Sequence, residues 1–166
     1  MTDDTTRLSL PLLHVAQAQK EMTHNEALTR IDLLLHGCVT GVAEDTPPAA
    51  PDVGQCWIVG DAPTGAWTGR TGQVAGWTAG GWRFVVPRDG MTLWWAGGET
   101  TATFRGTRWH PGEVRATRLV IGGTAVVGAQ QPEIIGPAGG NSVDSECRAV
   151  LERVLVALRG HGLIAG

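Results

Sequence analysis

Residues 82–95, Trp-Arg-Phe-Val-Val-Pro-Arg-Asp-Gly-Met-Thr-Leu-Trp-Trp, decide the fold class of this chain of 166 residues. Large apolar side chains alternate with other residues from Trp82 to Val86, and a period of two is the period of a β-strand. The segment 87–90 has the composition of a turn, and residues 91–95 then resemble a second strand. The stretch therefore predicts strands joined by tight turns.

Further short strands are predicted on the C-terminal side, at residues 101–105, 118–121 and 124–127. Gly122 and Gly123 separate the last two and match a two-residue hairpin loop. Strands this short, at nearly even spacing, are typical of a small antiparallel sandwich or barrel. With the helices predicted at both ends, the fold class is α+β: a Gly- and Trp-rich β-sandwich or barrel flanked by two amphipathic helices.

The N-terminal helix is predicted over residues 25–36, and a shorter helical turn is predicted before it, around residues 16–20. Thr23 and Glu26 have the spacing of a capping box, and Gly37 follows as the expected stop. Between them, apolar residues recur at helical spacing: Ala27, Leu28, Ile31, Leu34 and Leu35.

The C-terminal helix is the more regular of the two. Asn141 and Ser142 are candidate N-caps, Asp144 and Glu146 suit the first turn, and the helix is expected to end at Gly160. Its apolar stripe must be covered, either by the chain's own β-domain or first helix, or by further copies of the chain. The stripe consists of Val143, Cys147, Val150, Leu151, Val154, Leu155 and Leu158.

Three segments follow from these patterns. Residues 1–46 are predicted to be an N-terminal helical docking segment, and a Pro-rich linker at 46–51 leads into the β-domain at 47–135. Residues 136–166 form a glycine-rich hinge followed by the C-terminal helix.

Composition disfavours several classes of protein. The net charge is −3 and only 17% of residues are charged, so a nucleic-acid-binding surface is not expected. The three cysteines are widely spaced, which favours free thiols over a disulfide framework or zinc site. We expect no signal peptide, no membrane span, and synthesis in the cytoplasm.

The motifs of common enzymes are also missing from the sequence. Glu21 and His24 have the spacing of one metal-ligand pair in a di-metal helical bundle, but the other glutamates and the second pair are missing. Residues 65–71 resemble a phosphate-binding loop that is one residue short and has arginine in place of lysine. We therefore expect no enzymatic activity, no cofactor and no metal.

Seven tryptophans and no tyrosine make indoles the main candidates for a binding surface. Trp57 and Trp82 are expected in the core, and the strand period places one of Trp94 and Trp95 inside and the other outside. Trp67 and Trp77 lie among glycines and are expected to be exposed. Indoles suit both cores and half-wet surfaces, so two interpretations stay open: an indole-rich core, or a platform that stacks on sugars through Trp67, Trp77, Trp94 and Trp95.

Several motifs resemble the DUF2793 family, a family of unknown function from alphaproteobacterial prophages and gene transfer agents. The most specific is Ala16-Gln17-Ala18-Gln19-Lys20-Glu21, followed by Thr23-His24-Asn25-Glu26. Others are Pro51 to Val59 around Cys56-Trp57, Thr64 to Trp67, Gly80 to Phe84, Pro87 to Gly90, and Leu158 to Ile164.

The resemblance implies a virion protein that is similar to a head spike or a tail-fibre component. It implies a homo-oligomer that docks on other virion proteins, and host polysaccharide as a further partner. The expected assembly interface combines Gln17, Gln19 and Glu21 with the C-terminal stripe. We expect a structural protein of a phage-like particle that forms a spike or fibre base for host attachment. The alternative is a lectin-like module that recognises host capsule polysaccharide.

Overall fold

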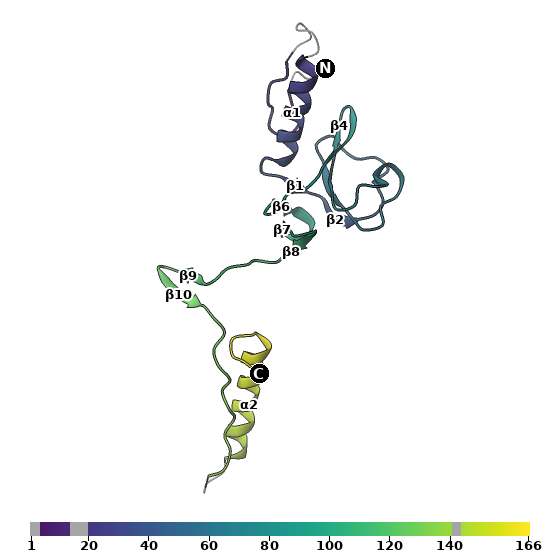
Figure 1. Cartoon of the computed structure of the whole chain (residues 1–166). Coiled ribbons are helices and arrows are strands. Elements are labelled where there is room, and N and C mark those ends of the chain that lie inside the picture. The colour runs from purple at the N-terminus through teal and green to yellow at the C-terminus, as the bar shows by residue number, and fades with distance from the viewer. Residues whose placement is uncertain (1–3, 14–19, 141–143) are drawn as a thin grey trace. The chain divides into compact units, whose positions relative to one another are not determined.

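The computed structural model describes residues 4–13, 20–140 and 144–166. The chain separates into two compact units, Met1–Glu113 and Val114–Gly166 (Figure 1). Helices and β-sheets occur together, which confirms the α+β class. In the described residues the sheets are open, and none closes into a barrel. The predicted boundaries after residues 46 and 135 stay predictions.

The first sheet of unit 1 has the strand order β2-β3-β4-β5. Its strands are β2 (Gly41–Glu44), β3 (Cys56–Val59), β4 (Val74–Thr78) and β5 (Gly81–Val85). The strand predicted from residue 82 is therefore present, and Val86 lies exposed beyond its end rather than facing the core as the alternation suggested. A tight turn pairs Trp77 with Trp82 across β4 and β5.

The second sheet of unit 1 has the order β1-β6-β7-β8. Its strands are β1 (Cys38–Val39), β6 (Thr92–Trp95), β7 (Thr100–Arg105) and β8 (Arg108–Pro111). Both sheets are mixed, because β1 runs parallel to β6 and β2 runs parallel to β3. The prediction of purely antiparallel sheets is thus wrong: β1 and β2 follow each other in the chain, and each adds to the edge of a different sheet.

One hydrophobic core contains residues from both sheets and from the first helix. Val39 and Ala102 of the second sheet and Val74 of the first are fully or almost fully buried in it. Its remaining members are Leu33, Cys56, Ile58 and Leu93. The two sheets of unit 1 are therefore held together by shared apolar burial.

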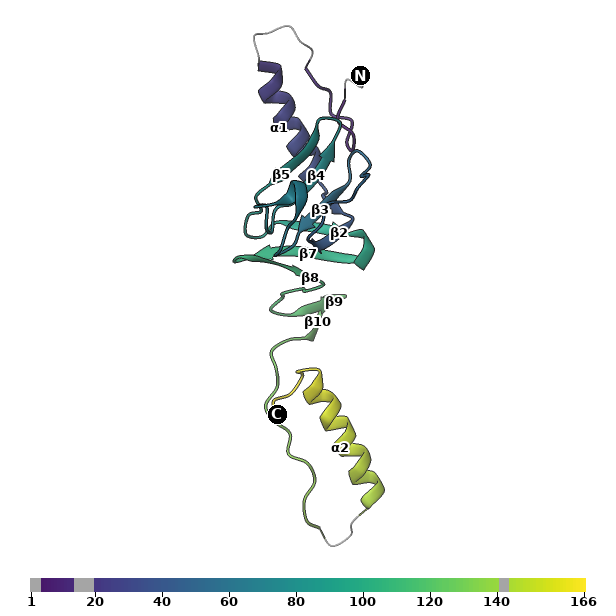
Figure 2. The same ribbon diagram turned by 90° about the vertical axis from the view of Figure 1, so that its right-hand side faces the viewer.

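Helix α1 (Lys20–Leu34) begins five residues before the predicted start. Thr23 and Glu26 lie inside it, so the predicted capping box is wrong. The Glu26 carboxylate instead accepts a hydrogen bond from Arg30 Nε at 3.0 Å and one from Arg83 Nε of β5 at 2.9 Å. Figure 2 shows α1 beside the β4–β5 strands that this ion pair joins it to.

The end of α1 also differs from the prediction. His36, rather than Gly37, has the left-handed conformation, with φ of 49°. Gly37 serves close packing instead, because a Cβ added there would lie 2.3 Å from Leu93 Cδ2. The predicted apolar face is also displaced: Ala27, Ile31 and Leu35 are exposed, whereas Leu33 is buried.

Asp32, in the last turn of α1, is a buried carboxylate that fastens the N-terminal segment to the helix. Its oxygens accept hydrogen bonds from the Thr5 hydroxyl at 2.7 Å, from the Arg7 amide at 3.0 Å and from the Leu8 amide at 2.6 Å. The Arg7 guanidinium donates to the backbone carbonyl oxygens of Asp32, Leu33 and His36. These carbonyls belong to the helix end, where cations and donors are stabilising.

Unit 2 contains the hairpin of β9 (Leu119–Ile121) and β10 (Thr124–Val127). Gly122 and Gly123 have φ of 55° and 83°, so the predicted two-residue loop is confirmed. All residues of both strands are exposed.

Helix α2 (Ser145–Gly160) is the second element of unit 2. Asp144 is its N-cap and accepts a hydrogen bond from the Cys147 amide at 2.9 Å. The predicted caps Asn141 and Ser142 lie outside the described residues, and the helix begins after Asp144. At the other end, Gly162 has φ of 69° and the Leu163 amide donates to the Leu158 carbonyl, which completes a Schellman motif.

An extended segment, residues 130–139, runs antiparallel beside α2, and we call it the strap (Figures 1 and 2). Gln131 bridges to Ile164. Farther along, Arg159 Nη2 donates to the Ile134 carbonyl at 2.8 Å, and Arg148 donates to the carbonyl oxygens of Pro137 and Gly139. The strap thus covers one face of α2.

Candidate functional site

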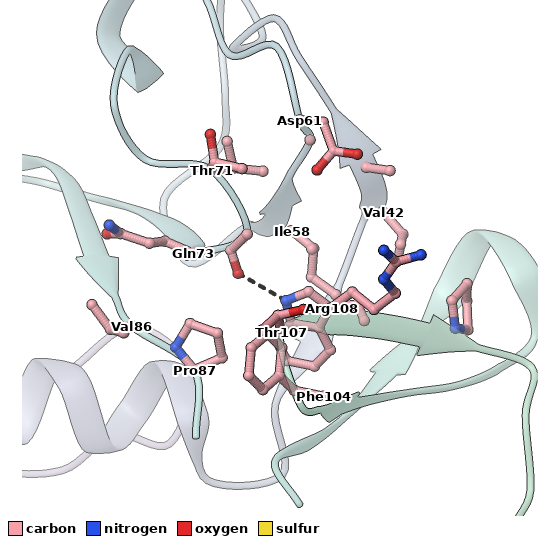
Figure 3. Close-up of a pocket in the computed structure, with 16 residues that line it drawn as sticks. Val42, Ile58, Asp61, Thr71, Gln73, Val86, Pro87, Phe104, Thr107 and Arg108 are labelled. Carbon is pink, nitrogen blue, oxygen red and sulfur yellow. Dashed lines mark hydrogen bonds between the residues drawn. The ribbon is translucent and has the colours of Figure 1, made fainter. Parts of the chain in front are cut away.

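A cleft of about 530 Å³ opens between the two sheets of unit 1 (Figure 3). Its volume falls within the range of pockets that hold small ligands. The apolar part includes Ile58 of β3 together with Phe104 and Trp109 of the second sheet. Polar groups that both donate and accept hydrogen bonds line the rest, namely Thr71, Gln73 and Thr107.

Trp109 holds the two sides of the cleft together. Its Nε1 donates to the Gly72 carbonyl oxygen at 2.8 Å, drawn as the dashed line in Figure 3. Its ring meets Phe104 edge to face, with 5.4 Å between the ring centroids. The indole is therefore both a structural tie and part of the cleft wall.

Two opposite charges reach the cleft from different sheets. Asp61 follows β3 of the first sheet, and Arg108 begins β8 of the second (Figure 3). Both are exposed, and neither side chain forms a hydrogen bond or an ion pair with another residue of the described ranges. They can therefore bind a polar ligand without first breaking an internal ion pair.

A β-bulge shapes the cleft wall at Ala43. The register of β2 on β3 shifts between Val42 and Glu44, and Ala43 has the left-handed φ of 59°. Gly60 packs against this bulge so closely that an added Cβ would lie 2.8 Å from the Ala43 carbonyl oxygen. Non-glycine residues in this conformation are uncommon and concentrate at functional sites.

The structure places Trp67 in the core, so the predicted exposure of this indole is wrong. It is fully buried in the 3₁₀ turn η1 (Gly65–Trp67), 5.2 Å from the ring of Trp82 and 6.2 Å from that of Trp57. Trp77 is half-buried and packs edge to face on Trp82 at 4.9 Å. The rings of Trp57, Trp67, Trp77 and Trp82 pack together, and we call them the indole cluster. The cluster corresponds to the first of the two interpretations of the tryptophans, an indole-rich core.

Trp94 and Trp95 divide as the strand period predicted. Trp94 is 46% exposed, whereas Trp95 packs against the shared core. None of the four predicted sugar-stacking residues lines the cleft. Trp109, Arg108 and Asp61 were not predicted as a group from the sequence, where the adjacent Arg108 and Trp109 are the only local signal.

The second candidate surface is the apolar stripe of α2. Cys147, Val150, Leu151 and Val154 are exposed, whereas Leu158 is half-buried and Leu155 is buried. Val143, Gln17 and Gln19, which the predicted assembly interface also includes, lie outside the described residues. Glu21 lies in the first turn of α1.

The described residues contain neither a metal-ligand cluster nor a membrane-spanning helix. No cluster of three or more histidine, cysteine, aspartate or glutamate side chains is found there in an arrangement that holds a metal. The helices of these ranges include none with the length and apolar character needed to cross a bilayer.

Comparison with protein families gives a match to part of the chain. The family described as protein of unknown function (DUF2793) matches residues 24–110, which is more than half of the chain. No curated protein matches this chain. The matched residues lie within unit 1 and include most of α1, the indole cluster and nearly all of the cleft lining. The chain belongs to the DUF2793 family.

Proposed function

We propose that this chain is a structural protein of a phage-like particle or gene transfer agent. In this proposal it forms a homo-oligomeric spike or fibre base, docks on other virion proteins and takes part in attachment to the host cell. The resemblance of the sequence motifs to virion proteins supports the assignment to a phage-like particle. The observation that carries the proposal is the uncovered apolar surface of unit 2.

Unit 2 buries very little of its apolar surface by itself. In its described residues the buried side chains are Leu155 and Ile164, at 3% and 5% exposure. A much larger set of apolar residues is exposed: Leu119, Val120, Ile121, Val126, Val127, Ile134, Ile135, Val150, Leu151, Val154, Val156 and Leu163. An isolated two-stranded hairpin and a small unit with so slight a core are marginally stable in water.

Assembly supplies the missing burial. Burying a Val, Leu or Ile side chain stabilises by roughly 1.5–3 kcal/mol, so each of these side chains that assembly covers adds to the stability of unit 2. Large exposed apolar patches are rare on monomeric proteins and mark interaction sites. In the proposed organisation, unit 1 is a β-sandwich module, and the helices α1 and α2 flank it and carry the assembly.

The experiment compares the purified full chain with purified particles. Sedimentation should give a homo-oligomer, and particles from the producing cell should contain the chain at fixed stoichiometry. Ile121→Asp, on the exposed hairpin, should weaken assembly, whereas Val53→Asp, at a residue that is also exposed but lies in unit 1, should leave it unchanged. A monomer that is absent from particles would contradict the proposal.

A second function, recognition of surface polysaccharide, is favoured by the cleft. Saccharides combine apolar C–H faces with many hydroxyl groups, and the cleft pairs aromatic rings with Asp61, Arg108 and neutral hydrogen-bonding groups. Calorimetric titration with host surface polysaccharide should show binding that Asp61→Ala and Arg108→Ala each reduce about tenfold. Trp94→Ala is the matched control for an exposed indole outside the cleft. Loss of binding in the control alone would move the site to Trp94.

A further inference from the structure

We infer that α2 packs in parallel against α2 of at least two further copies of this chain, around a common axis. The contact consists of Cys147, Leu151, Val154 and Leu158, which we call the seam. The inference rests on the homo-oligomer proposed above. It adds which surface joins the copies, that their α2 helices run parallel, and that the oligomer contains at least three copies.

The spacing of the seam is that of a coiled coil. Its residues follow one another at intervals of four, three and four, which places Leu151 and Leu158 at a positions and Cys147 and Val154 at d positions. Val150 falls at the neighbouring g position and is also exposed. Four successive a and d positions with apolar residues, Cys147 to Leu158, therefore lie along one line of α2.

The neighbouring face of the helix already has its cover. Leu155, at an e position, is buried, and Gly136 of the strap lies beside it. Arg159 and Arg148 fix the strap through its backbone carbonyls. The strap therefore covers the face of α2 that adjoins the seam but leaves Leu151 and Val154 exposed.

The absence of charge on the seam favours an identical partner. The charged residues within α2 fall at b and c positions, away from the line of contact, apart from Arg148 at an e position, which donates to strap carbonyls: they are Glu146, Glu152, Arg153 and Arg159. Asp144, one heptad before Leu151, is the N-cap of the helix and accepts from the Cys147 amide. Identical seams can thus meet without like charges facing each other, and each copy presents the same complementary surface. A foreign partner selected by charge would find no charge to recognise here.

The residue types at a and d set the order and direction. Leucine at a with the β-branched isoleucine at d favours three or four strands over two, and Leu151 with the β-branched Val154 follows this pattern in one of the two layers. Cyclic symmetry of this order turns every copy about one axis, so all the helices point the same way. The Cys147 side chains of all copies then meet in a single layer near the axis.

Mild oxidation of the full chain tests this arrangement. An added oxidant, copper–phenanthroline with oxygen, takes two electrons and two protons from two Cys147 thiols as the S–S bond forms. Covalent dimers should appear within the non-covalent oligomer and should be lost in Cys147→Ser. Cys56 is buried and Cys38 is half-buried, so Cys38→Ser should keep the cross-link.

Two matched substitutions test the seam itself. Leu151→Asp should dissociate the oligomer in sedimentation, with at least a tenfold loss of association. Val156→Asp places the same charge at an exposed apolar residue on the opposite side of α2 and should keep the oligomer. All seven tryptophans precede residue 114, so their fluorescence checks in each variant that unit 1 is folded.

The outcomes separate this inference from the proposed function. An oligomer that neither cross-links through Cys147 nor responds to Leu151→Asp overturns the seam and leaves homo-oligomerisation standing. A dimer with α2 antiparallel, or a seam covered by a different protein, overturns the inference as well. A monomeric wild-type chain overturns both. If Leu151→Asp fails to fold, the cross-linking result decides.

Discussion

The indole N–H of Trp109 donates to the carbonyl oxygen of Gly72 over 2.8 Å and so joins the last strand of one sheet to the turn before β4 of the other. The bond is partly buried, where its loss leaves a carbonyl group without a partner. Thr71, Gln73 and Thr107, which flank the bonded residues, are all part of the cleft lining. Together with the shared core, this hydrogen bond therefore helps to set the width of the cleft.

Trp109→Phe is expected to lower the free energy of unfolding of unit 1 by about 1–3 kcal/mol, because the aromatic ring is kept but the hydrogen bond to Gly72 is lost. Urea denaturation followed by tryptophan fluorescence measures the change. The matched substitution Trp94→Phe removes an indole that is 46% exposed and should cost less than about 0.5 kcal/mol. Equal effects of the two substitutions would contradict the structural role of Trp109.

Local patterns predicted the parts of the fold that depend on near neighbours. The strand from Trp82, the Gly122-Gly123 loop and the body of α2 each follow from periodicity or turn chemistry over a few residues. The capping box at Thr23 failed because the residues before it, Lys20 to Met22, are themselves good helix formers and extend α1 backwards.

Features that depend on distant residues could not be predicted in this way. Trp67 sits among glycines, which suggested exposure, yet its environment consists of the rings of Trp57 and Trp82, which belong to other strands. The cleft likewise joins Asp61 to Arg108, which are far apart in sequence. Asp32 is tolerated in the core because its hydrogen-bond donors come from the segment around Arg7.

Asp32→Asn should release the N-terminal segment from α1. The amide keeps one acceptor oxygen, so part of the hydrogen bonding to Thr5, Arg7 and Leu8 is lost, at a cost of about 1–3 kcal/mol. Trypsin should then cleave after Arg7 at least tenfold faster than in the unaltered chain. Asp61→Asn, which changes an exposed carboxylate with no partner in the described residues, should leave this rate unchanged. Continued protection in Asp32→Asn would show that other contacts hold the segment.

Cys56 should make the stability of unit 1 depend on pH in the alkaline range. Burial raises the pKa of its thiol from the ordinary 9.0 to about 11. Above pH 9 the unfolded chain loses this proton while the folded chain keeps it, so stability is lost as pH rises towards 11. The loss should reach about 1 kcal/mol at pH 10. Cys56→Ala should remove this part of the decline, measured by urea denaturation at pH 8 and pH 10; parallel profiles would refute the assignment.

Gly37→Ala should destabilise unit 1 by steric overlap. Gly37 is buried at the end of α1, and an added Cβ would lie 2.3 Å from Leu93 Cδ2 and 3.2 Å from the Leu34 carbonyl oxygen. Overpacking of this kind costs about 1–3 kcal/mol in urea denaturation. Gly128→Ala is the matched control, since nothing lies within 4 Å of a Cβ added there. If the overlap with Leu93 is the cause, removing the Leu93 side chain should relieve it. The loss of unfolding free energy caused by Gly37→Ala should then be smaller by about 1 kcal/mol or more in a Leu93→Ala background than in the unaltered chain. An undiminished cost in that background would place the strain at the backbone of α1 instead.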